Sequence, residues 1–412
     1  MKTFKELYNE LFFSALEGDF YKTEEIECDP LQLDCLLNPR KHPLVLQTGK
    51  CDCDGKKARV CAGRCPFGAI RESEAGGISI DSEQCVGCAM CIDGCDSKKL
   101  IESTDILPVL KAVRSAKGPA YALIAPAFLG QFKNGVTPGK LRTALKKVGF
   151  DGMLEVALFA DILTLKEALE FDKNIRTESD FQLTSCCCPM WIAMIRKVYN
   201  ELMPHVPGSV SPMIACGRTV KLLHPDAVTV FIGPCLAKKA EAREKDLAGA
   251  VDFVLTFREV QDIFDALRID PSEMEESEKD HSSKAGRIYA RAGGVSQAVE
   301  NTVNRLNPQR PISIRTLHAH GVPACKEMIN GLLAGGQQAN FYEGMGCVGG
   351  CVGGPRSVTG ADEGKRLVDV YGEASPYQTP PENPYVAELL QRIGIDSVES
   401  LLEHSEIFTR RF

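Results

Sequence analysis

Eighteen cysteines among 412 residues constrain this chain more than any other feature of its sequence. The segment that opens with Met1-Lys2-Thr3 has no apolar signal-peptide core, so we expect a cytoplasmic chain. Thiols stay reduced in that compartment, and clustered cysteines there are typically metal ligands rather than disulfides. The grouped cysteines are Cys51, Cys53, Cys61 and Cys65; Cys85, Cys88, Cys91 and Cys95; Cys186, Cys187 and Cys188; Cys235; and Cys347 and Cys351.

The charge and hydropathy of the chain exclude two classes of partner. The formal net charge is −7, from 48 basic and 55 acidic residues that are mixed along the sequence. This balance argues against a nucleic-acid-binding surface and against a polybasic membrane patch. Since no apolar run reaches about 18 residues, we expect no transmembrane helix.

The distribution of apolar residues divides the chain into four segments. Residues 1–45 should form an N-terminal helix, over about 4–16, and an acidic, proline-containing linker. Residues 46–105 hold eight cysteines and few large apolar side chains, so this module would depend on bound metal to fold. Residues 106–370 have a mixed α/β pattern, and residues 371–412 form a C-terminal tail with several prolines.

Short apolar runs and helix signals predict the elements of the largest segment. Buried strands are expected over 121–124, 228–232 and 253–257. Between the first two, Thr137-Pro138 offers an N-cap and a first-turn proline, and Gly149 ends the helix that follows.

The two cysteine runs of residues 46–105 predict a pair of 4Fe–4S clusters. Residues 85–95 have the Cys-x2-Cys-x2-Cys-x3-Cys spacing of bacterial ferredoxins, in which the fourth cysteine binds the other cluster. The run over 51–65 shares only the Cys-x3-Cys-Pro ending. A zinc knuckle is the alternative, but zinc needs only four ligands and leaves the duplication unexplained. The expected ligand sets are Cys51, Cys53, Cys61 and Cys95 for one cluster, and Cys65, Cys85, Cys88 and Cys91 for the other.

Three separate motifs in residues 106–370 predict a third cluster. The first is Thr-Ser-Cys-Cys-Cys-Pro-Met-Trp at 184–191, and the second is Gly-Pro-Cys-Leu-Ala-Lys-Lys-Ala-Glu at 233–241. The third, at 343–355, places two cysteines four residues apart in a glycine-rich loop, where the backbone can approach a bulky inorganic group. One cysteine from each of the first two motifs would complete four ligands.

In this order and spacing, the three motifs resemble the signatures of the iron-only (FeFe) hydrogenases. The resemblance runs from about residue 46 to 360. It implies a two-lobed α/β hydrogenase domain preceded by a bacterial ferredoxin-like α+β domain. It also implies an H-cluster, which is a 4Fe–4S cubane joined to a two-iron unit that carries CO, cyanide and azadithiolate. The implied reaction is 2H⁺ + 2e⁻ ⇌ H₂, with ferredoxin or a similar electron carrier and H-cluster maturation enzymes as partners.

The resemblance also implies roles for individual residues around the H-cluster. Lys238 would donate a hydrogen bond to one cyanide, Ala125-Pro126-Ala127 would line the other, and Met345 would pack over the bridging CO. The cubane ligands would be Cys188, Cys235, Cys347 and Cys351, with Cys351 bridging to the two-iron unit.

A buried reaction of protons requires a relay of titratable groups. Cys187 matches the relay thiol of the family, and Glu167 and Glu170 match its two relay carboxylates. Their i, i+3 spacing puts the two glutamates on one face of an expected helix. Without the motif, a glutamate pair at this spacing is typical of a solvated helix face. Because both glutamates match relay positions of the family, we favour the relay.

Three departures from the family pattern concern the same site. The first motif has one extra cysteine, which leaves Cys186 without a role. Gly233 replaces the usual methionine of the second motif. Pro207 stands where the relay serine is expected, so Ser209 or water would have to replace it.

Two other functions remain open from the sequence. A hydrogenase-like iron–sulfur assembly protein would keep the cubane cysteines but would lack the two-iron unit. Such a scaffold has no need of Lys238, Cys187, Glu167 or Glu170, so these residues favour the enzyme. A low-turnover H₂ sensor would usually carry a signalling domain, for which the tail after residue 371 is too short.

Overall fold

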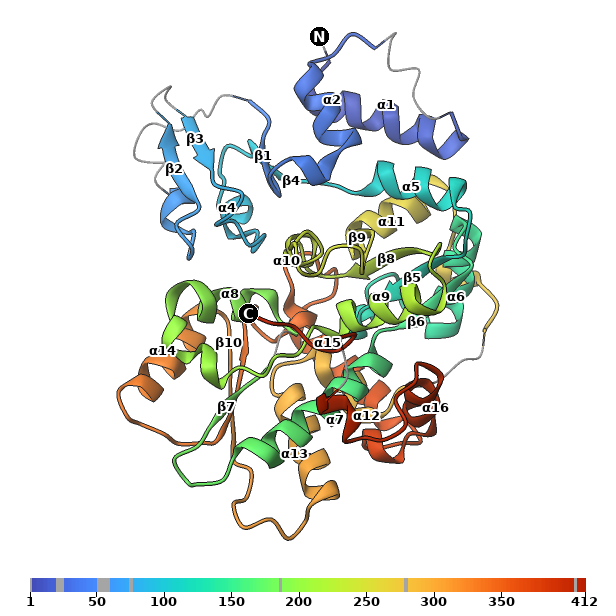
Figure 1. The fold of residues 1–412 in the computed structure, drawn as a ribbon. Coiled ribbons are helices and arrows are strands. Elements are labelled where there is room, and N and C mark those ends of the chain that lie inside the picture. Colours follow the sequence, from blue (N-terminus) through green and yellow to red (C-terminus); the bar gives the residue numbers. More distant parts are fainter. Residues whose placement is uncertain are drawn as a thin grey trace.

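The computed structural model describes residues 2–19, 26–49, 60–73, 77–184, 187–277, 281–403 and 406–412. The expected ligands Cys51 and Cys53, and the unassigned Cys186, lie outside the described residues. Two parallel sheets organise the larger part of the molecule, and a small cysteine-rich module lies above them at the upper left of Figure 1. None of the helices in the described ranges is long and apolar enough to span a membrane.

The first sheet has four parallel strands in the order β6-β5-β8-β9. Their bounds are Ala120–Ile124 for β5, Gly152–Glu155 for β6, Val228–Gly233 for β8 and Phe253–Thr256 for β9. The expected strands over 121–124 and 228–232 are confirmed. The third was expected to reach Phe257, but it ends one residue earlier because Thr256 is the N-cap of the next helix. The Thr256 side chain accepts a hydrogen bond from the Glu259 backbone N–H at 3.2 Å, and the Glu259 carboxylate reaches back to the Thr256 N–H at 2.6 Å.

Helices cover this sheet, and one of them has the predicted caps. Thr137 accepts a hydrogen bond from the Lys140 N–H at 3.2 Å, Pro138 is the first helical residue, and Gly149 ends the helix at a φ of 121°. This helix is α6 (Pro138–Val148). The other helices of this half are α5 (Ile106–Ser115), α9 (Pro212–Leu223), α10 (Ala237–Glu241) and α11 (Phe257–Ala266).

The second sheet has three parallel strands in the order β10-β11-β7. The strands are β7 (Gln182–Leu183), β10 (Thr316–His320) and β11 (Phe341–Met345), with the helices α8 (Pro189–Val198), α12 (Lys284–Arg287), α13 (Gly294–Leu306) and α14 (Val322–Leu333) around them. Helix α7 (Ala157–Asn174) contacts α9 on one side and α12 and α13 on the other. The two sheets form the two lobes of an α/β domain, as expected (Figure 1).

The described part of the cysteine-rich module, residues 45–49, 60–73 and 77–102, has two small antiparallel sheets. In one, β1 (Val45–Gln47) pairs with β4 (Leu100–Glu102), and in the other β2 (Ile70–Ser73) pairs with β3 (Gly77–Ile80). Helix α4 (Met90–Asp93) carries Cys91. Arg356, which follows the third motif, forms ion pairs with Asp93 and Glu102 and so fastens the module to the larger domain.

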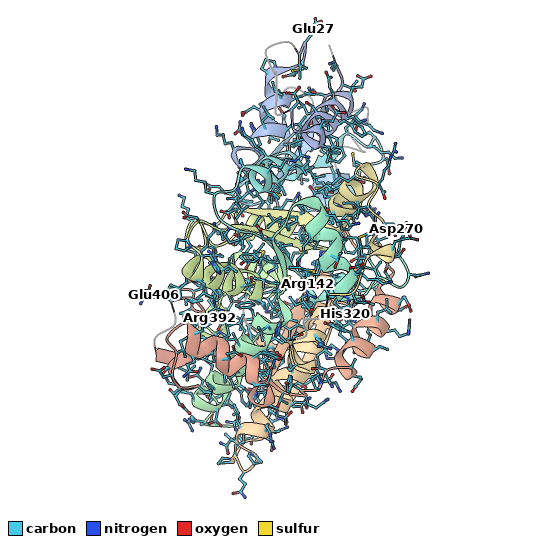
Figure 2. The ribbon with its side chains drawn as sticks, turned by 90° about the vertical axis from the view of Figure 1, so that its right-hand side faces the viewer. Glu27, Arg142, Asp270, His320, Arg392 and Glu406 are labelled. Carbon is cyan, nitrogen blue, oxygen red and sulfur yellow. The ribbon has the colours of Figure 1, made fainter. Side chains whose placement is uncertain are left out.

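Both ends of the chain pack onto the larger domain. Helix α1 (Phe4–Glu17) forms as predicted, but the stretch expected to be a linker contains a second helix, α2 (Pro30–Leu37). The reason is local, because Asp29 accepts the Leu31 N–H at 2.8 Å and Pro30 occupies the first helical position. In Figure 2, Glu27 lies at this N-terminal end of the molecule.

The expected boundary at residue 370 falls inside helix α15 (Ala361–Glu373). The Tyr371 hydroxyl donates to Glu155 at the end of β6 at 2.7 Å, and Glu155 also faces the buried Arg142 at 3.6 Å. Arg142 is labelled in Figure 2. Helices α16 (Pro384–Arg392) and α17 (Ser400–Glu403) contact α7, and Phe408 belongs to the main apolar core. The last 42 residues are therefore part of the same packed unit.

Candidate functional site

The ends of two adjacent strands in the first sheet form one wall of the site. Strand β5 leads into Ala125-Pro126-Ala127, and β8 leads into Gly233-Pro234-Cys235. The Ala125 N–H donates to the Ile232 carbonyl at 2.9 Å, which holds the two loops together. The strand order changes direction between β5 and β8, and crevices for ligands form at such switch points of α/β sheets.

The second sheet supplies the opposite wall in the same way. Strand β7 leads to Cys187 and Cys188, and its parallel neighbour β11 leads to Cys347. The Gly346 N–H donates to the Cys188 sulfur at 3.4 Å, across 158 residues of sequence. Cys351 begins a short 3₁₀ turn (Cys351–Gly353) on the same loop as Cys347.

The four expected cubane cysteines lie within electrostatic range of one another. Burial, and then the negative charge of Cys188, raises the pKa of Cys235 to about 11 and that of Cys351 to about 12. Burial and then Cys235 raise the pKa of Cys347 well above its ordinary value. Thiols that lie this close together ionise readily only when a cation compensates their negative charge. Cysteine ligands of a metal cluster have this property.

The glycines of the third motif permit its close packing. A Cβ at Gly350, whose φ is 89°, would lie 2.6 Å from the Ala292 backbone nitrogen. A Cβ at Gly344 would lie 1.9 Å from the Trp191 ring of helix α8. Glycine at position 344 therefore lets strand β11 pack against Trp191, and glycine at position 350 lets the following loop pack against Ala292.

Lys238 lies beside these cysteines with its ammonium group buried. Its Nζ is 2.6 Å from a carboxylate oxygen of Glu241. Burial by itself would lower the pKa of Lys238, but the carboxylate of Glu241 and the thiolates of Cys235 and Cys351 raise it. The lysine therefore stays charged. The neighbouring Lys239 is buried too, and it pairs with Glu259 at 2.8 Å.

The apolar residues expected around the two-iron unit are buried in the same region. Met345 is only 2% exposed, and its sulfur lies 2.8 Å from the position that a Cβ on Gly350 would take. A Cβ at Gly233 would lie 2.7 Å from the Phe231 ring and 3.1 Å from the Ala125 Cβ. The space that a larger side chain at position 233 would need is thus already filled.

Cys187 and Glu167 lie within electrostatic range of each other. Burial raises the pKa of Cys187, and so do the negative charges of Cys188 and Glu167. Glu167 is 1% exposed on α7. Tyr289, which the sequence reasoning did not identify, is near both, and its pKa is raised by burial and then by Glu167. Its hydroxyl oxygen accepts a hydrogen bond from Thr164 at 2.9 Å.

Glu170, the second expected carboxylate, has two partners that form a buried triad with it. Lys166, one turn earlier on α7, forms an ion pair with Glu170, and its Nζ also donates to the Ser209 hydroxyl at 2.8 Å. Ser209 also lies close enough to Glu170 to influence the pKa of its carboxyl group. Burial raises the pKa of Glu170, although Lys166 and Ser209 act to lower it.

The sequence reasoning missed Lys166 because a lysine among glutamates on a helix is typical of a solvated face. The available signal was the largely apolar stretch Ala-Asp-Ile-Leu-Thr-Leu at 160–165 directly before it, in which only Asp161 is charged. Backbone hydrogen bonds to the C-terminal tail hold the segment that contains Ser209 in place. The Val210 N–H donates to the Phe408 carbonyl at 3.0 Å, and the Arg410 N–H donates to the Gly208 carbonyl at 2.7 Å.

In the cysteine-rich module, four of the expected ligands surround one small cavity. The cavity is lined by Cys65, Cys85, Cys88 and Cys91 together with apolar side chains. Cys95 lies elsewhere in the module. Burial acts against it, but hydrogen bonds from Ser97 and from backbone N–H groups at 98–100 lower the pKa of the Cys95 thiol. Within the described ranges, no three His, Cys, Asp or Glu side chains are grouped to hold a single metal ion.

This cavity lies directly against the second motif. Gly87, between Cys85 and Cys88, has a φ of 71°, and a Cβ there would lie 3.1 Å from the backbone of Leu236 and Ala237. The negative charge of Cys88 also contributes to the raised pKa of Cys347. The two groups of cysteines are therefore neighbours in space.

Comparisons with known proteins agree with this arrangement. The family model "Iron only hydrogenase large subunit, C-terminal domain" matches residues 119–355. Iron hydrogenase 1 of Clostridium pasteurianum is 28% identical over 256 residues, which cover 52% of this chain and 45% of that protein. A cytosolic Fe–S cluster assembly factor NAR1 homolog of Schizosaccharomyces japonicus is 23% identical over 240 residues, or 49% of this chain and 46% of that protein. The chain thus spans less than half the length of either relative.

Solved structures show the same fold. A variant of the [FeFe]-hydrogenase HydA1 from Chlamydomonas reinhardtii superposes with a TM-score of 0.61 at 22% sequence identity. The superposition covers 75% of this chain and 98% of that one.

Proposed function

The chain belongs to the iron-only hydrogenase family, and from that premise we propose that it is an FeFe hydrogenase that catalyses 2H⁺ + 2e⁻ ⇌ H₂. The observation that carries the proposal is the buried, charged Lys238 beside Cys235 and Cys351. A 4Fe–4S cubane alone is held by its thiolates and needs no ammonium group. The ammonium group of Lys238 is already paired with Glu241, and its remaining N–H groups can donate to an anionic ligand of the cluster that no thiolate holds.

The donor set fits the H-cluster of this family. Its cubane would be held by Cys188, Cys235, Cys347 and Cys351, whose mutual repulsion in a buried place calls for compensation by iron. When bound, the H-cluster supplies the iron at which protons and electrons combine. Lys238 would orient an anionic ligand of the cluster. Buried Met345 and the loop Ala125-Pro126-Ala127 would exclude water from it.

We assign proton transfer to Cys187, Glu167, Ser209 and Glu170. Cys187 would exchange the proton at the cluster, and Glu167 would hold it next, because the two groups are within electrostatic range. Ser209, which Lys166 links to Glu170, would take the place of the serine that Pro207 cannot supply. Glu170 would lie nearer the surface than Glu167 and Ser209, since it is partly exposed while those two are buried.

We assign electron transfer to two 4Fe–4S clusters in the cysteine-rich module. The cavity lined by Cys65, Cys85, Cys88 and Cys91 suits one of them, and its contact with Leu236 and Ala237 favours electron transfer to the cubane. The second cluster would use Cys61 and Cys95 with Cys51 and Cys53, which lie outside the described residues. Exchange of electrons with ferredoxin, dependence on maturation enzymes and a cytoplasmic location belong to the same proposal.

The similarity to the assembly factor supports a second candidate function, that of an iron–sulfur scaffold. An iron–sulfur scaffold would bind the cubane without the two-iron unit. The triad of Lys166, Glu170 and Ser209 and the thiol of Cys187 favour the enzyme, because a scaffold moves no protons. An H₂ sensor would share the whole site and would differ from the enzyme in its turnover.

Infrared spectroscopy separates the enzyme from the scaffold. We expect protein produced with the H-cluster maturation enzymes to absorb in the region of metal-bound CO and cyanide, and to reduce protons with reduced methyl viologen. Protein produced without those enzymes is the matched control, and it should contain cubanes only. A blank infrared region in matured protein with full cubane iron would overturn the proposal in favour of the scaffold.

A further inference from the structure

The segment 406–412 runs antiparallel to residues 208–210, which include the proposed relay hydroxyl. Ser209 pairs with Thr409 in an isolated antiparallel bridge. The two backbone hydrogen bonds that join residues 208 and 210 to residues 410 and 408 lie on either side of this bridge. The place of the Ser209 backbone therefore depends on the segment 406–412.

Two contacts hold the segment 406–412 against the larger domain near α9. Phe408 is fully buried in the main apolar core. The Arg218 guanidinium, on α9, donates to the Thr409 carbonyl at 2.9 Å and to the Glu406 carbonyl at 2.7 Å. These two contacts fix the segment on one side of the bridge.

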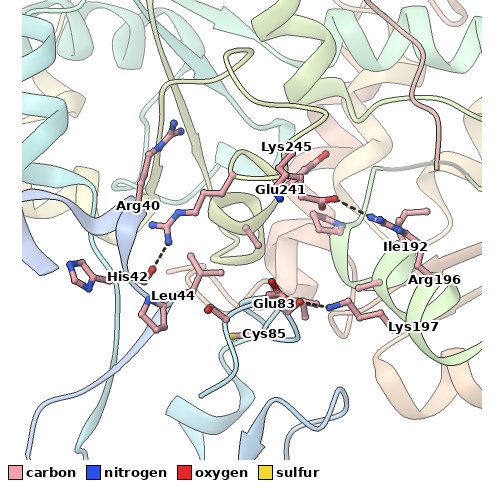
Figure 3. Close-up of a pocket in the computed structure, with 18 of the residues that line it drawn as sticks. Arg40, His42, Leu44, Glu83, Cys85, Ile192, Arg196, Lys197, Glu241 and Lys245 are labelled. Atoms are coloured by element: carbon pink, nitrogen blue, oxygen red, sulfur yellow. Dashed lines mark hydrogen bonds and ion pairs between the residues drawn. The ribbon is translucent and has the colours of Figure 1, made fainter. Parts of the chain in front are cut away.

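Arg410 holds the same segment on its other side. Its buried side chain forms ion pairs with Glu244 and with Asp246, the second at 2.8 Å. Both carboxylates lie in the turns that follow α10, the helix that carries Lys238. Arg196 of α8 also pairs with Glu244 at 3.0 Å, and the dashed line at Arg196 in Figure 3 marks this ion pair. Arg410 thus ties the segment 406–412 to the residues that follow the second motif.

These ion pairs determine where the backbone of Arg410 lies. A buried guanidinium must keep its carboxylate partners, because an unpaired charge in the interior is costly. The Arg410 N–H in turn holds the Gly208 carbonyl, directly before Ser209. The Ser209 hydroxyl lies 2.8 Å from the Lys166 ammonium, which is within the range that proton transfer requires. A displacement of about 1 Å in such a group can cost about a hundredfold in rate.

We propose that Arg410 is a positioning residue for proton transfer, which keeps the Ser209 hydroxyl in the relay. The inference rests on the proposed function and adds a residue that carries no proton itself. Through its ion pairs with Glu244 and Asp246, Arg410 makes proton delivery depend on the residues that follow the second motif.

The first test is Arg410→Gln in the matured holoenzyme. We expect kcat for H₂ evolution with reduced methyl viologen to fall about tenfold, because the hydroxyl is displaced but not removed. The KM for methyl viologen should not change, since no group on the electron path moves. The matched control is Arg411→Gln, at the adjacent and exposed arginine. Equal kcat values in the two variants would overturn the positioning role.

Conservative changes on both sides of the ion pair test the same contact with less disturbance. Arg410→Lys keeps the positive charge but offers a single head group, so it should recover most of the turnover that Arg410→Gln loses. Asp246→Asn leaves the arginine in place with one partner fewer, and it should slow turnover by a smaller factor. No recovery by Arg410→Lys, together with full activity of Asp246→Asn, would show that the ion pairs do not set the position of Ser209.

A double variant separates positioning from a general loss of structure. If Arg410 acts only through Ser209, Arg410→Gln should slow the Ser209→Ala protein no further. A further tenfold loss in the double variant would show that Arg410 supports activity elsewhere, and it would overturn the proposal.

Amide hydrogen exchange keeps this test separate from the proposed function, because it requires no turnover. In protein that contains cubanes only, the Val210 amide should exchange about tenfold faster in Arg410→Gln than in wild type or Arg411→Gln. Unchanged exchange would overturn the positioning role whether or not H₂ is formed. Faster exchange in Arg410→Gln, combined with no H₂ formation by matured wild type, would count against the proposed function alone.

Discussion

The ammonium nitrogen of Lys166 lies 2.8 Å from the hydroxyl oxygen of Ser209, and both residues are buried. The same ammonium forms an ion pair with Glu170. Ser209 thus accepts a hydrogen bond from Lys166, and its own proton is free to face the Glu170 carboxylate. A fixed positive charge therefore lies inside the proposed proton relay and influences when Glu170 carries a proton.

The variant Lys166→Met tests this influence through the pH profile. Burial already raises the pKa of Glu170, and Lys166 is the strongest opposing influence. Removing the ammonium should raise this pKa further, so Glu170 stays protonated up to a higher pH. The acidic limb of the profile for methyl-viologen-driven H₂ evolution should move up by about one pH unit. The control is Lys147→Met, at an exposed position in the last turn of α6. An unmoved limb in a variant with full iron would contradict the role of Lys166.

Loss of the Ser209 hydroxyl should slow turnover. Because the Ser209 hydroxyl lies at Lys166 and near Glu170 in the proposed relay, Ser209→Ala should reduce the rate of H₂ evolution about a hundredfold. Ser211→Ala is a close control, since Ser211 is equally buried but only caps α9 by accepting the Ile214 N–H. That variant should lose about 1 kcal/mol of stability and keep its turnover. A fully active Ser209→Ala would show that water carries the proton.

Cys187→Ala should interrupt proton transfer and leave the cofactor in place. We expect the H₂ evolution rate to fall about a hundredfold or more, with the infrared bands of CO and cyanide retained. Cys216→Ala, a buried thiol in the apolar core, controls for the loss of a sulfur atom. Cys186→Ala decides the register of the motif: if it abolishes activity and Cys187→Ala does not, the relay thiol has been assigned one position too late.

Iron analysis tests the ligand set of the cysteine-rich module. Cys85→Ala should lower the iron content by about four atoms per chain, because a 4Fe–4S cluster is lost as a unit. Cys35→Ala, at a buried cysteine of α2, should leave the iron content unchanged. Should Cys85→Ala retain its iron, the grouping of Cys65, Cys85, Cys88 and Cys91 as one ligand set would be wrong.

Local sequence signals predicted most of the fold that carries the site. Thr137, Pro138 and Gly149 predicted helix α6 because N-caps, first-turn prolines and terminal glycines act over a few residues. The strand predicted at 253–257 ends one residue early, at Thr256, because Thr256 is the N-cap of helix α11. Helix α2 was missed because its eight residues looked like part of an acidic linker, although Asp29-Pro30 is a helix start.

The sequence by itself determined which residues can bind iron, since the spacing of the cysteines and the glycines around them is a local property. Only the tertiary structure decided which of these loops meet. Cys188 and Gly346 are 158 residues apart and come together because β7 and β11 are parallel neighbours, whose carboxyl ends lie at one edge. Lys166 and Ser209 are 43 residues apart, and their contact depends on how α7 packs and on the tail that holds residues 208–210. A linear pattern cannot specify such a contact, because it arises from packing between whole elements.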